Sequence, residues 1–310
     1  MTSNIEDIAS IHLGKAGDGS VVKPYVTPDA IDASLLVAIP RSINREAYNI
    51  DSNMLPFVGF DTWNCYEVSF MTNNGYPINC VAKIIYPSDS KFIVESKSLK
   101  LYLNSFNMVK LGNDIDTAIL NAQYYIEADL SKILQLKFIA VSLYTDETYN
   151  INSIPLHGFT PIEKLVNIEN IQFDLFNEDI NILKSQSSSI QIPIQVKTNT
   201  LRSNCRVTNQ PDWGDVYIHI KGNEVPTYES LLQYIVSMRK ESHFHEEICE
   251  MIYKRLYDKF TPVELMVVCM YTRRGGIDIN PARATDNFLF DKYCSGLETN
   301  FGATPKTMRQ

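Results

Sequence analysis

A repeated pattern of residues constrains the fold of this chain more than any other feature. The pattern SLxxYxxSF at 98–106 reappears as SLxxYxxSM at 230–238, and VxLYT at 141–145 reappears as VxMYT at 268–272. The offsets are 132 and 127 residues. Two matches in the same order at nearly the same spacing indicate two copies of one structural unit.

Each copy of the first pattern predicts an amphipathic helix. Its apolar residues recur at i, i+3, i+4 and i+7, which places them on one helical face. In the first copy these are Leu99, Tyr102, Leu103 and Phe106, and in the second they are Leu231, Tyr234, Ile235 and Met238. A second helix is expected to follow in each half. Its apolar stripe in the C-terminal half comprises Cys249, Ile252, Tyr253, Leu256 and Phe260.

Strand-like segments flank each predicted helix pair. Residues 79–86 and 216–221 precede the pairs, and residues 138–145 and 265–272 follow them, the last of these being the expected final strand. The chain is therefore expected to be α+β, with two tandem modules, each a mainly antiparallel sheet with two helices packed on one face.

The length of 310 residues suits two domains. We expect an N-terminal module over 1–160 and a linker with a C-terminal module over 161–310. The repeat pattern weakens between 150 and 197, where the polar tract QSSS at 186–189 suggests an exposed turn or linker. The first twenty residues are expected to form a loosely attached arm.

Charge and hydropathy exclude several classes of protein. The formal net charge of −8 argues against a broad nucleic-acid-binding surface, which requires a basic face. No basic region followed by an apolar stretch opens the chain, and no apolar run is long enough to span a bilayer. A cytoplasmic protein is the expectation.

The six cysteines form no CxxC pair and are too few for a disulfide scaffold. His243 and His245 lie two residues apart without a third ligand nearby, so no metal site is predicted.

The segment RSNCRVTNQPDW at 202–213 is the most unusual in the chain. Cys205 is flanked by cations that favour its thiolate, and Pro211 suggests a turn that returns Asp212 toward it. These features are those of a catalytic cysteine. The alternative is a free thiol on a strand, with Asp212 capping a turn.

Two other segments have both functional and ordinary interpretations. The run ESKSLKLY at 95–102 begins a helix, where Ser96 or Ser98 can serve as the N-cap. The run YTRRGG at 271–276 suits an anion close to the backbone, or a basic turn. Gly14, Gly17 and Gly19 do not form a dinucleotide fingerprint, and no Walker loop is present.

Together these motifs resemble one family over nearly the whole chain: the NADPH-dependent 7-cyano-7-deazaguanine reductases of queuosine biosynthesis, in their two-module form. The motifs are LGK at 13–15, DASLL at 32–36, PRSINR at 40–45, ESKSLKLY at 95–102, SNC and QPDW within 203–213, FHE at 244–246 and YTRRGGIDINP at 271–281. Residues 150–197 match least well, and Arg206 and Asn209 depart from the family pattern.

The resemblance implies a tandem tunnel fold, a homodimer and no nucleic-acid or membrane partner. It implies that Cys205 is the nucleophile and Asp212 the proton donor. The substrate 7-cyano-7-deazaguanine would be held by Val94, Glu95, Ser96, His245 and Glu246. The cofactor NADPH would be held by Ser96, Lys97, Lys100, Arg274 and Gly275.

The implied chemistry is sound. Thiolate addition converts the nitrile to a covalent thioimide, a better hydride acceptor, and two hydrides then give 7-aminomethyl-7-deazaguanine. Asp212 must be protonated, or share a proton with the thiol, when the nitrile arrives. The lysines occur only in the first copy, and the nucleophile and arginines only in the second. NADPH is therefore expected to bridge the two kinds of module, within one chain or across a dimer.

Three alternatives remain at this point. One is a relative that adds ammonia to the thioimide, which the complete segment 95–102 argues against. Another is a metal-dependent, pterin-type enzyme of the same fold, which lacks its ligand set here. The third is a non-catalytic module that binds purine-like ligands, which the intact Cys205 and Asp212 argue against.

Overall fold

Alternating inward-facing residues build a long antiparallel sheet in the N-terminal half. The computed structural model describes residues 28–298 except 146–147, 149–155, 157 and 189–191, so the expected N-terminal arm lies outside the described residues. Strands β2 (Val58–Thr72) and β3 (Pro77–Pro87) form a hairpin, and β6 (Ala140–Tyr144) pairs with β3. Helices α3 (Ser96–Asn104) and α4 (Ile115–Leu134) lie between β3 and β6 in the chain.

The C-terminal half repeats this order. Strands β9 (Ile194–Cys205) and β10 (Pro211–Lys221) precede helices α5 (Tyr228–Ser237) and α6 (His245–Phe260), and β13 (Glu264–Tyr271) follows them. The apolar helical residues expected from the periodicity are all buried. The α+β class, with two helices on one face of a mainly antiparallel sheet in each module, is confirmed and agrees with a tandem tunnel fold.

Short elements complete the fold. In the N-terminal half they are η1 (Ala33–Leu35), β1 (Ala38–Pro40), α2 (Ser42–Glu46), β4 (Phe92–Val94) and β5 (Lys110–Gly112). Between the halves lie β7 (Thr160–Pro161), η2 (Ile162–Lys164), η3 (Ile168–Asn170), η4 (Ile180–Ile182) and β8 (Ser185–Ser187). In the C-terminal half they are β11 (Glu224–Pro226), η5 (Met238–Lys240), β12 (Ser242–His243), α7 (Phe288–Tyr293) and α8 (Ser295–Glu298).

Three expectations need correction. Residues 265–272 do not form the last strand, because β14 (Ile277–Ala284) follows and pairs with β13. Part of the polar tract at 186–189 lies in β8, which pairs with β11. The N-cap of α3 is Glu95, whose carboxylate accepts a hydrogen bond from the Ser98 backbone N–H, and neither Ser96 nor Ser98 has that place.

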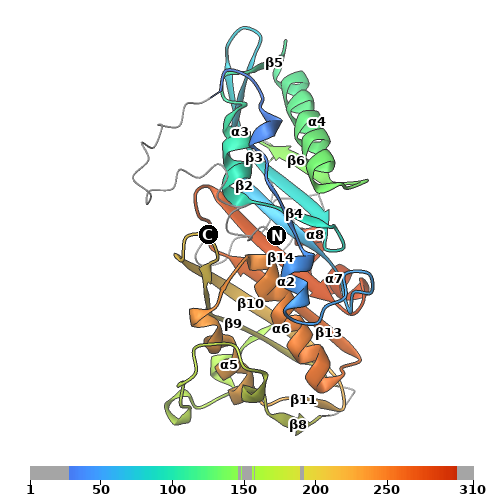
Figure 1. Ribbon diagram of the computed structural model, residues 1–310, viewed down its shortest axis with the longest axis vertical. Coiled ribbons are helices and arrows are strands. Elements are labelled where there is room, and N and C mark those ends of the chain that lie inside the picture. Colours follow the sequence, from blue (N-terminus) through green and yellow to red (C-terminus); the bar gives the residue numbers. More distant parts are fainter. Residues whose placement is uncertain (1–27, 146–147, 149–155, 157, 189–191, 299–310) are drawn as a thin grey trace, which may run out of the picture.

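Strand β14 joins the two halves into one ten-stranded sheet (Figure 1). It pairs with β2 from Ile277 opposite Cys65 to Ala284 opposite Val58. At Gly59 the backbone of β14 approaches so closely that a Cβ atom would collide with the Ala282 carbonyl. On the face away from α3–α6, α7 and α8 cover part of the sheet. No helix among the described residues is long and apolar enough to cross a membrane.

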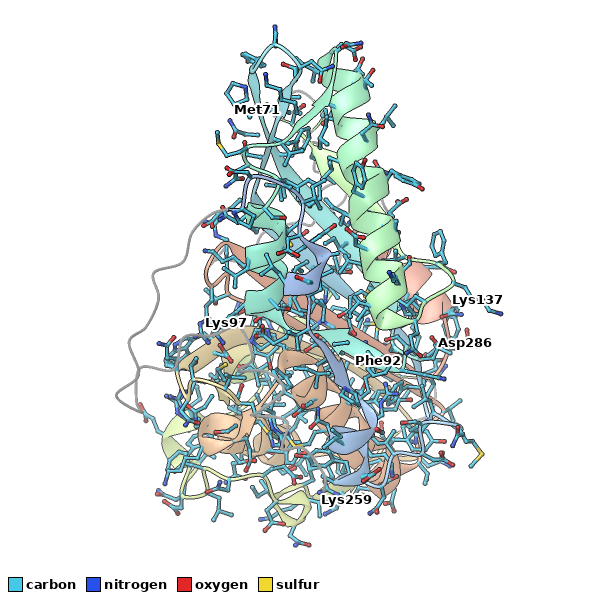
Figure 2. All side chains as sticks on the ribbon, turned by 45° about the horizontal axis from the view of Figure 1, so that its top comes forward. Met71, Phe92, Lys97, Lys137, Lys259 and Asp286 are labelled. Atoms are coloured by element: carbon cyan, nitrogen blue, oxygen red, sulfur yellow. The ribbon has the colours of Figure 1, made fainter. Side chains whose placement is uncertain are left out.

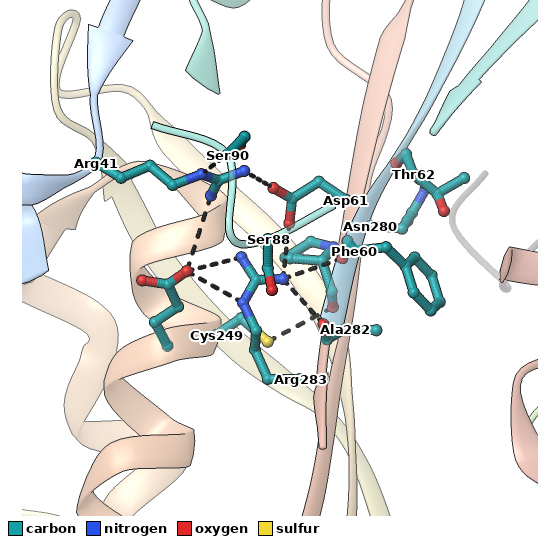
Figure 3. A network of polar contacts seen from close by, with 12 residues as sticks. Arg41, Phe60, Asp61, Thr62, Ser88, Ser90, Cys249, Asn280, Ala282 and Arg283 are labelled. Atoms are coloured by element: carbon teal, nitrogen blue, oxygen red, sulfur yellow. Dashed lines mark hydrogen bonds and ion pairs between the residues drawn. The ribbon is translucent and has the colours of Figure 1, made fainter. Parts of the chain in front are cut away.

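We call the pairing of β14 with β2 the seam, and β2 and β14 the seam strands. Buried charges gather beside it (Figure 3). Arg283 of β14 donates to Asp61 of β2 at 2.8 Å and to Glu250 of α6 at 2.9 Å. Arg45 of α2 donates to the same Glu250 at 2.7 and 2.9 Å, and Arg41 pairs with Asp61. All five side chains are at most 6% exposed. This seam cluster of Arg41, Arg45, Asp61, Glu250 and Arg283 ties both halves to α2 and α6.

The seam cluster predicts a large effect of removing one charge. Glu250→Gln leaves the buried guanidiniums of Arg45 and Arg283 short of a carboxylate, and breaking a buried pair costs about 3–5 kcal/mol. Urea unfolding should show that loss. The control is Lys254→Gln on the same helix, where an exposed pair with Asp258 contributes about 0.3–0.5 kcal/mol. Equal stability of the two variants would contradict a structural role for the cluster.

Candidate functional site

A cavity of about 330 Å³ lies where the two modules meet on the helical face of the sheet. Every site residue expected from the sequence lines it, and both modules of one chain contribute. These residues are Val94, Glu95, Ser96, Lys97, Lys100, Cys205, Asp212, His245, Glu246, Arg274 and Gly275. Figure 2 labels Lys97 where α3 comes close to the C-terminal module.

The N-terminal module contributes the start of α3. Strand β4 ends at Val94, Glu95 caps the helix and is 2% exposed, and the helix then presents Ser96, Lys97 and, one turn later, Lys100. The Lys97 Nζ lies 3.9 Å from Glu95 Oε1. The start of α3 therefore places the acidic group of Glu95 inside the cavity and the two partly exposed ammonium groups of Lys97 and Lys100 at the edge of the cavity.

The hairpin of β9 and β10 brings Cys205 and Asp212 to one face. Ser203 is the register partner of Asp212, and Cys205 lies two residues beyond Ser203. Because side chains in a strand alternate with a period of two, Cys205 and Asp212 share a face. The turn closes through the Cys205 N–H, which donates to Gln210 O at 2.8 Å, and through Asn209, whose φ of 53° is left-handed. Asparagine tolerates that conformation better than most residues.

Asp212 is held by an arginine and a histidine. Its carboxylate pairs with Arg274 and lies 3.3 Å from His245 Nε2. Burial works to raise the pKa of Asp212, but the hydrogen bonds and charges of His245 and Arg274 outweigh it and hold the pKa below its usual value. The lowered pKa favours the carboxylate form of Asp212 over the protonated form.

His245 and Glu246 begin α6. The His245 ring stacks on Tyr271, with centroids 3.8 Å apart and planes 7° from parallel. Glu246 is 3% exposed, and its Oε1 has no hydrogen-bond partner among the described residues. Burial and the nearby charge of Asp61 raise the pKa of Glu246 to about 8. An acceptor this buried and unpaired is suited to a ligand that brings its own N–H groups.

The turn between β13 and β14 separates the two arginines. Arg274 lines the cavity and donates to Gln210 Oε1 at 2.5 Å, whereas Arg273 lies over the Tyr66 ring, 4.5 Å from its centroid. Gly275 has a φ of 56°, and a Cβ there would meet only the Lys100 side chain. An anion can therefore approach the backbone at this turn.

Sequence reasoning missed several residues that line the cavity. They are Trp63, Ile93, Gln210, His243, Phe244, Ile277 and Ile279. Trp63, Ile277 and Ile279 come from β2 and β14, the strands that form the seam. Alternation of apolar and polar residues at 277–280 is the one signal that indicated β14.

His243 and Arg206 lie beside the cavity in an ionic network. His243 contacts the carboxylates of Glu241 and Glu247, and Arg206 donates to Glu247 and Asn44. Among the described residues, no group of three His, Cys, Asp or Glu side chains has a metal-binding arrangement. All six cysteines are free, and Cys205 alone among them is not fully buried.

Known proteins match both halves of the chain. The model of a family described as nitrile reductase, 7-cyano-7-deazaguanine-reductase N-terminal domain, matches residues 27–143, and that of a QueF-like protein matches residues 211–288. A crystal structure of an archaeosine synthase QueF-Like in the apo form is 18% identical over 33% of this chain and 98% of that chain, with a TM-score of 0.29. The two family matches confirm the resemblance seen in the motifs: the chain belongs to the QueF family of nitrile reductases.

Proposed function

We propose that this protein reduces the nitrile of 7-cyano-7-deazaguanine to the primary amine 7-aminomethyl-7-deazaguanine with NADPH, in queuosine biosynthesis. The observation that carries the proposal is the single cavity shared by a partly exposed cysteine, an ionised aspartate and a buried, unpaired glutamate. The homodimer, the cytoplasmic location and modules divided near residue 160 are parts of the same proposal. The boundary near residue 160 is supported by the pairing of Thr160 with Val196 of β9, a strand of the C-terminal module.

Cys205 is the group that attacks the nitrile carbon. Its sulfur forms a bond to that carbon, the carbon–nitrogen triple bond loses one π bond, and the nitrogen takes a proton to give a thioimide. The proton comes from the thiol itself. Asp212 accepts it as sulfur attacks and delivers it to the nitrogen, so that Asp212 ends in the ionised state in which it began.

Arg274 and His245 prepare Asp212 for this transfer. Their charges keep the carboxylate ionised before the nitrile arrives, so it is ready to act as a base. The stacking of His245 on Tyr271 fixes the imidazole that touches Asp212. A carboxylate on the same face of the β9–β10 hairpin as the nucleophile, and in the same cavity, supports a role in general acid–base catalysis.

Glu246 recognises the purine-like edge of the substrate. That edge carries an N–H and an amino group side by side, and a carboxylate accepts both in a bidentate pair. Only the ionised form of Glu246 provides two acceptors. Glu95, on the opposite module, adds a second buried acid to the wall.

The residues of the cavity edge fit NADPH. Lys97, Lys100 and Arg274 provide three partly exposed cations for phosphate groups, and Gly275 leaves the backbone open to them. Ser96 lines the same edge. When bound, the dinucleotide supplies hydride. Since the lysines and Arg274 come from different modules, the bound cofactor would bridge them within one chain.

Apolar side chains line the rest of the site. Trp63, Ile277 and Ile279 are at most 8% exposed and belong to the seam strands. They keep water from the carbon–nitrogen bond, which matters because an imine hydrolyses readily.

The first prediction concerns covalent capture. Wild-type protein incubated with the nitrile in the absence of NADPH should gain the mass of the substrate on Cys205, and with NADPH it should consume the cofactor and release the amine. Cys205→Ala should do neither. Asp212→Asn should form the adduct about 10²–10⁴-fold more slowly, since it cannot carry the proton. Mass spectrometry of rapidly quenched samples measures both, and an adduct on another cysteine would refute the assignment.

The second prediction concerns the pH dependence of binding. With a pKa raised to about 8, Glu246 is largely protonated at pH 7 and ionises as the pH rises through 8. Affinity should therefore increase from pH 6.5 to 8.5 when measured by calorimetry in a Cys205→Ala background, where no adduct forms. Glu246→Gln in that background should remove the dependence and weaken binding at pH 8.5 by about 1.5–3 kcal/mol. Affinity independent of pH in the parent would exclude this role.

The third prediction concerns cofactor selectivity. Lys97→Ala should raise the Michaelis constant for NADPH more than that for the nitrile, and should narrow the preference for NADPH over NADH. Arg273→Ala is the matched control, because its guanidinium lies over Tyr66 and outside the cavity lining. Steady-state kinetics with both cofactors separates the two variants. If Lys97→Ala discriminates as well as the control does, Lys97 does not bind the cofactor.

A further inference from the structure

The backbone beside Cys205 is held by a short parallel strand. Strand β12 pairs with the end of β9, with His243 opposite Cys205 and Ser242 opposite Asn204. The Asn204 N–H donates to Glu241 O at 2.7 Å. Cys205 is the last residue of β9, so this contact anchors the point at which the nucleophile leaves the sheet.

The side chain of His243 lies between two carboxylates. Its Nδ1 is 2.9 Å from Glu247 Oε2, and its Nε2 is 3.1 Å from Glu241 Oε2 and 3.0 Å from the Tyr48 hydroxyl. A neutral imidazole has one N–H and can donate to only one of the two acids, whereas an imidazolium donates to both. Two carboxylates on opposite ring nitrogens thus favour the charged ring, which is 16% exposed and also lines the cavity.

The ionic network continues to the residue after the nucleophile. Arg206 donates from Nη1 to Glu247 Oε2 at 3.2 Å and to Asn44 Oδ1 of α2 at 2.8 Å. The result is a chain of alternating charges: Glu241, His243, Glu247 and Arg206. Two anions and two cations balance only while His243 keeps its proton.

Tyr48, Glu178 and Arg255 also lie near His243. Among the described residues, no arginine or lysine forms a contact with the imidazole ring that could replace its charge. Glu241 also accepts from the Glu178 N–H at 2.8 Å. Arg255 of α6 pairs with Glu178 and lies over the Tyr48 ring, 5.4 Å from its centroid. Arg255 and Glu178 therefore neutralise each other, and the charge state of His243 decides the balance beside Cys205.

We propose that protonated His243 is a positioning residue, which holds the turn bearing Cys205 against α2 and α6 so that the thiol is aligned for attack on the nitrile. The proposal rests on the proposed function, because it concerns the same nucleophile. Loss of the proton leaves Glu241 and Glu247 without their shared partner. The hairpin keeps its contacts to α6 through Arg206 and through Asp212 with His245, but β12 is no longer held between the two acids, and the sulfur is less well aligned.

The pKa of His243 sets the pH range over which the ring keeps its proton. Burial works to lower the pKa of His243, but hydrogen bonds to Glu241 and Glu247 outweigh it and raise the pKa to about 9. A free histidine titrates near about 6.5. Because the folded pKa is the higher one, the stabilisation is fully present below about pH 6.5 and is lost as the pH rises through about 9.

The test compares adduct formation on Cys205 in wild type and in His243→Gln, without NADPH, from pH 6.5 to 10. Glutamine is neutral, and its single amide nitrogen cannot replace the two ring nitrogens that donate to the two acids. Because His243→Gln removes a charge beside Cys205, the ionisation of the thiol is measured in each protein by its rate of alkylation, and each rate of adduct formation is corrected for it. Below about pH 8 the rate of wild type should exceed that of His243→Gln by roughly 10- to 100-fold, the scale expected for a misaligned reacting group. The ratio of the two rates should fall toward one above pH 9.

Two further variants complete the experiment. His243→Arg keeps the charge and two donors at every pH, so below pH 8 its rate should approach that of wild type. Above pH 9 its rate should not show the decline expected of wild type. Lys254→Gln, which alters a pair with Asp258 elsewhere on α6, is the control and should behave as wild type does. Because His243 lines the cavity, nitrile binding is measured in a Cys205→Ala background with and without His243→Gln, so that weaker binding is distinguished from slower attack. A rate ratio of one at pH 7, or a ratio that stays constant to pH 10, would overturn the role of His243. Absence of any wild-type adduct would refute the proposed function instead.

Discussion

The ion pairs buried between α6 and the seam strands hold this molecule in one arrangement. Arg283, Asp61 and Glu250 come from β14, β2 and α6, so the N-terminal and C-terminal modules are joined by charges that water cannot reach. Separating the modules would leave each charge without its partner, at a cost of several kcal/mol. Glu250 lies one helical turn after Glu246. The cluster that joins the modules therefore also positions Glu246, the buried acid of the cavity, and its members Asp61 and Arg41 influence the pKa of Glu246.

Duplication followed by divergence explains how one chain builds a complete cavity. Both copies start a helix after their second strand, but only the first puts Glu95, Ser96 and two lysines there; the second has Thr227 as its cap. Only the second has a cysteine at the end of its first strand, β9, and two arginines after β13. The modules thus contribute different chemical groups to one shared space, and β14 brings them together.

The sequence predicts the helices well and the seam poorly, for physical reasons. The apolar stripes of α3, α5 and α6 follow the helical period, and each faces the core of its own module, so periodicity alone finds them. Strand β14 buries Asp278, Asn280 and Arg283 and contains Pro281, so it does not read as a strand. In β2 a register shift between Cys65 and Val68 interrupts the alternation of apolar residues.

The same reasons limit what the sequence reveals of the site. The polar residues of the motifs were found, whereas apolar lining residues such as Trp63 and Ile279 were not, because an apolar side chain on a strand gives no sign that it faces a cavity. The ionised state of Asp212 depends on Arg274, 62 residues away, and the setting of His243 depends on Tyr48, 195 residues away. Contacts of this kind exist only once the chain has folded.

The central claim is that both modules of one chain build each site, and complementation between two inactive variants tests it most directly. Cys205→Ala lacks the C-terminal nucleophile, and Glu95→Ala lacks the N-terminal acid. The two chains, carrying different affinity tags, are co-expressed, and assemblies that contain both are isolated and assayed for reduction of the nitrile. If each site lies within one chain, every site in the mixed assembly has a defect, and activity stays at the level of the single variants. Recovery of a substantial part of the wild-type activity would show that sites form across chains, and would contradict the account.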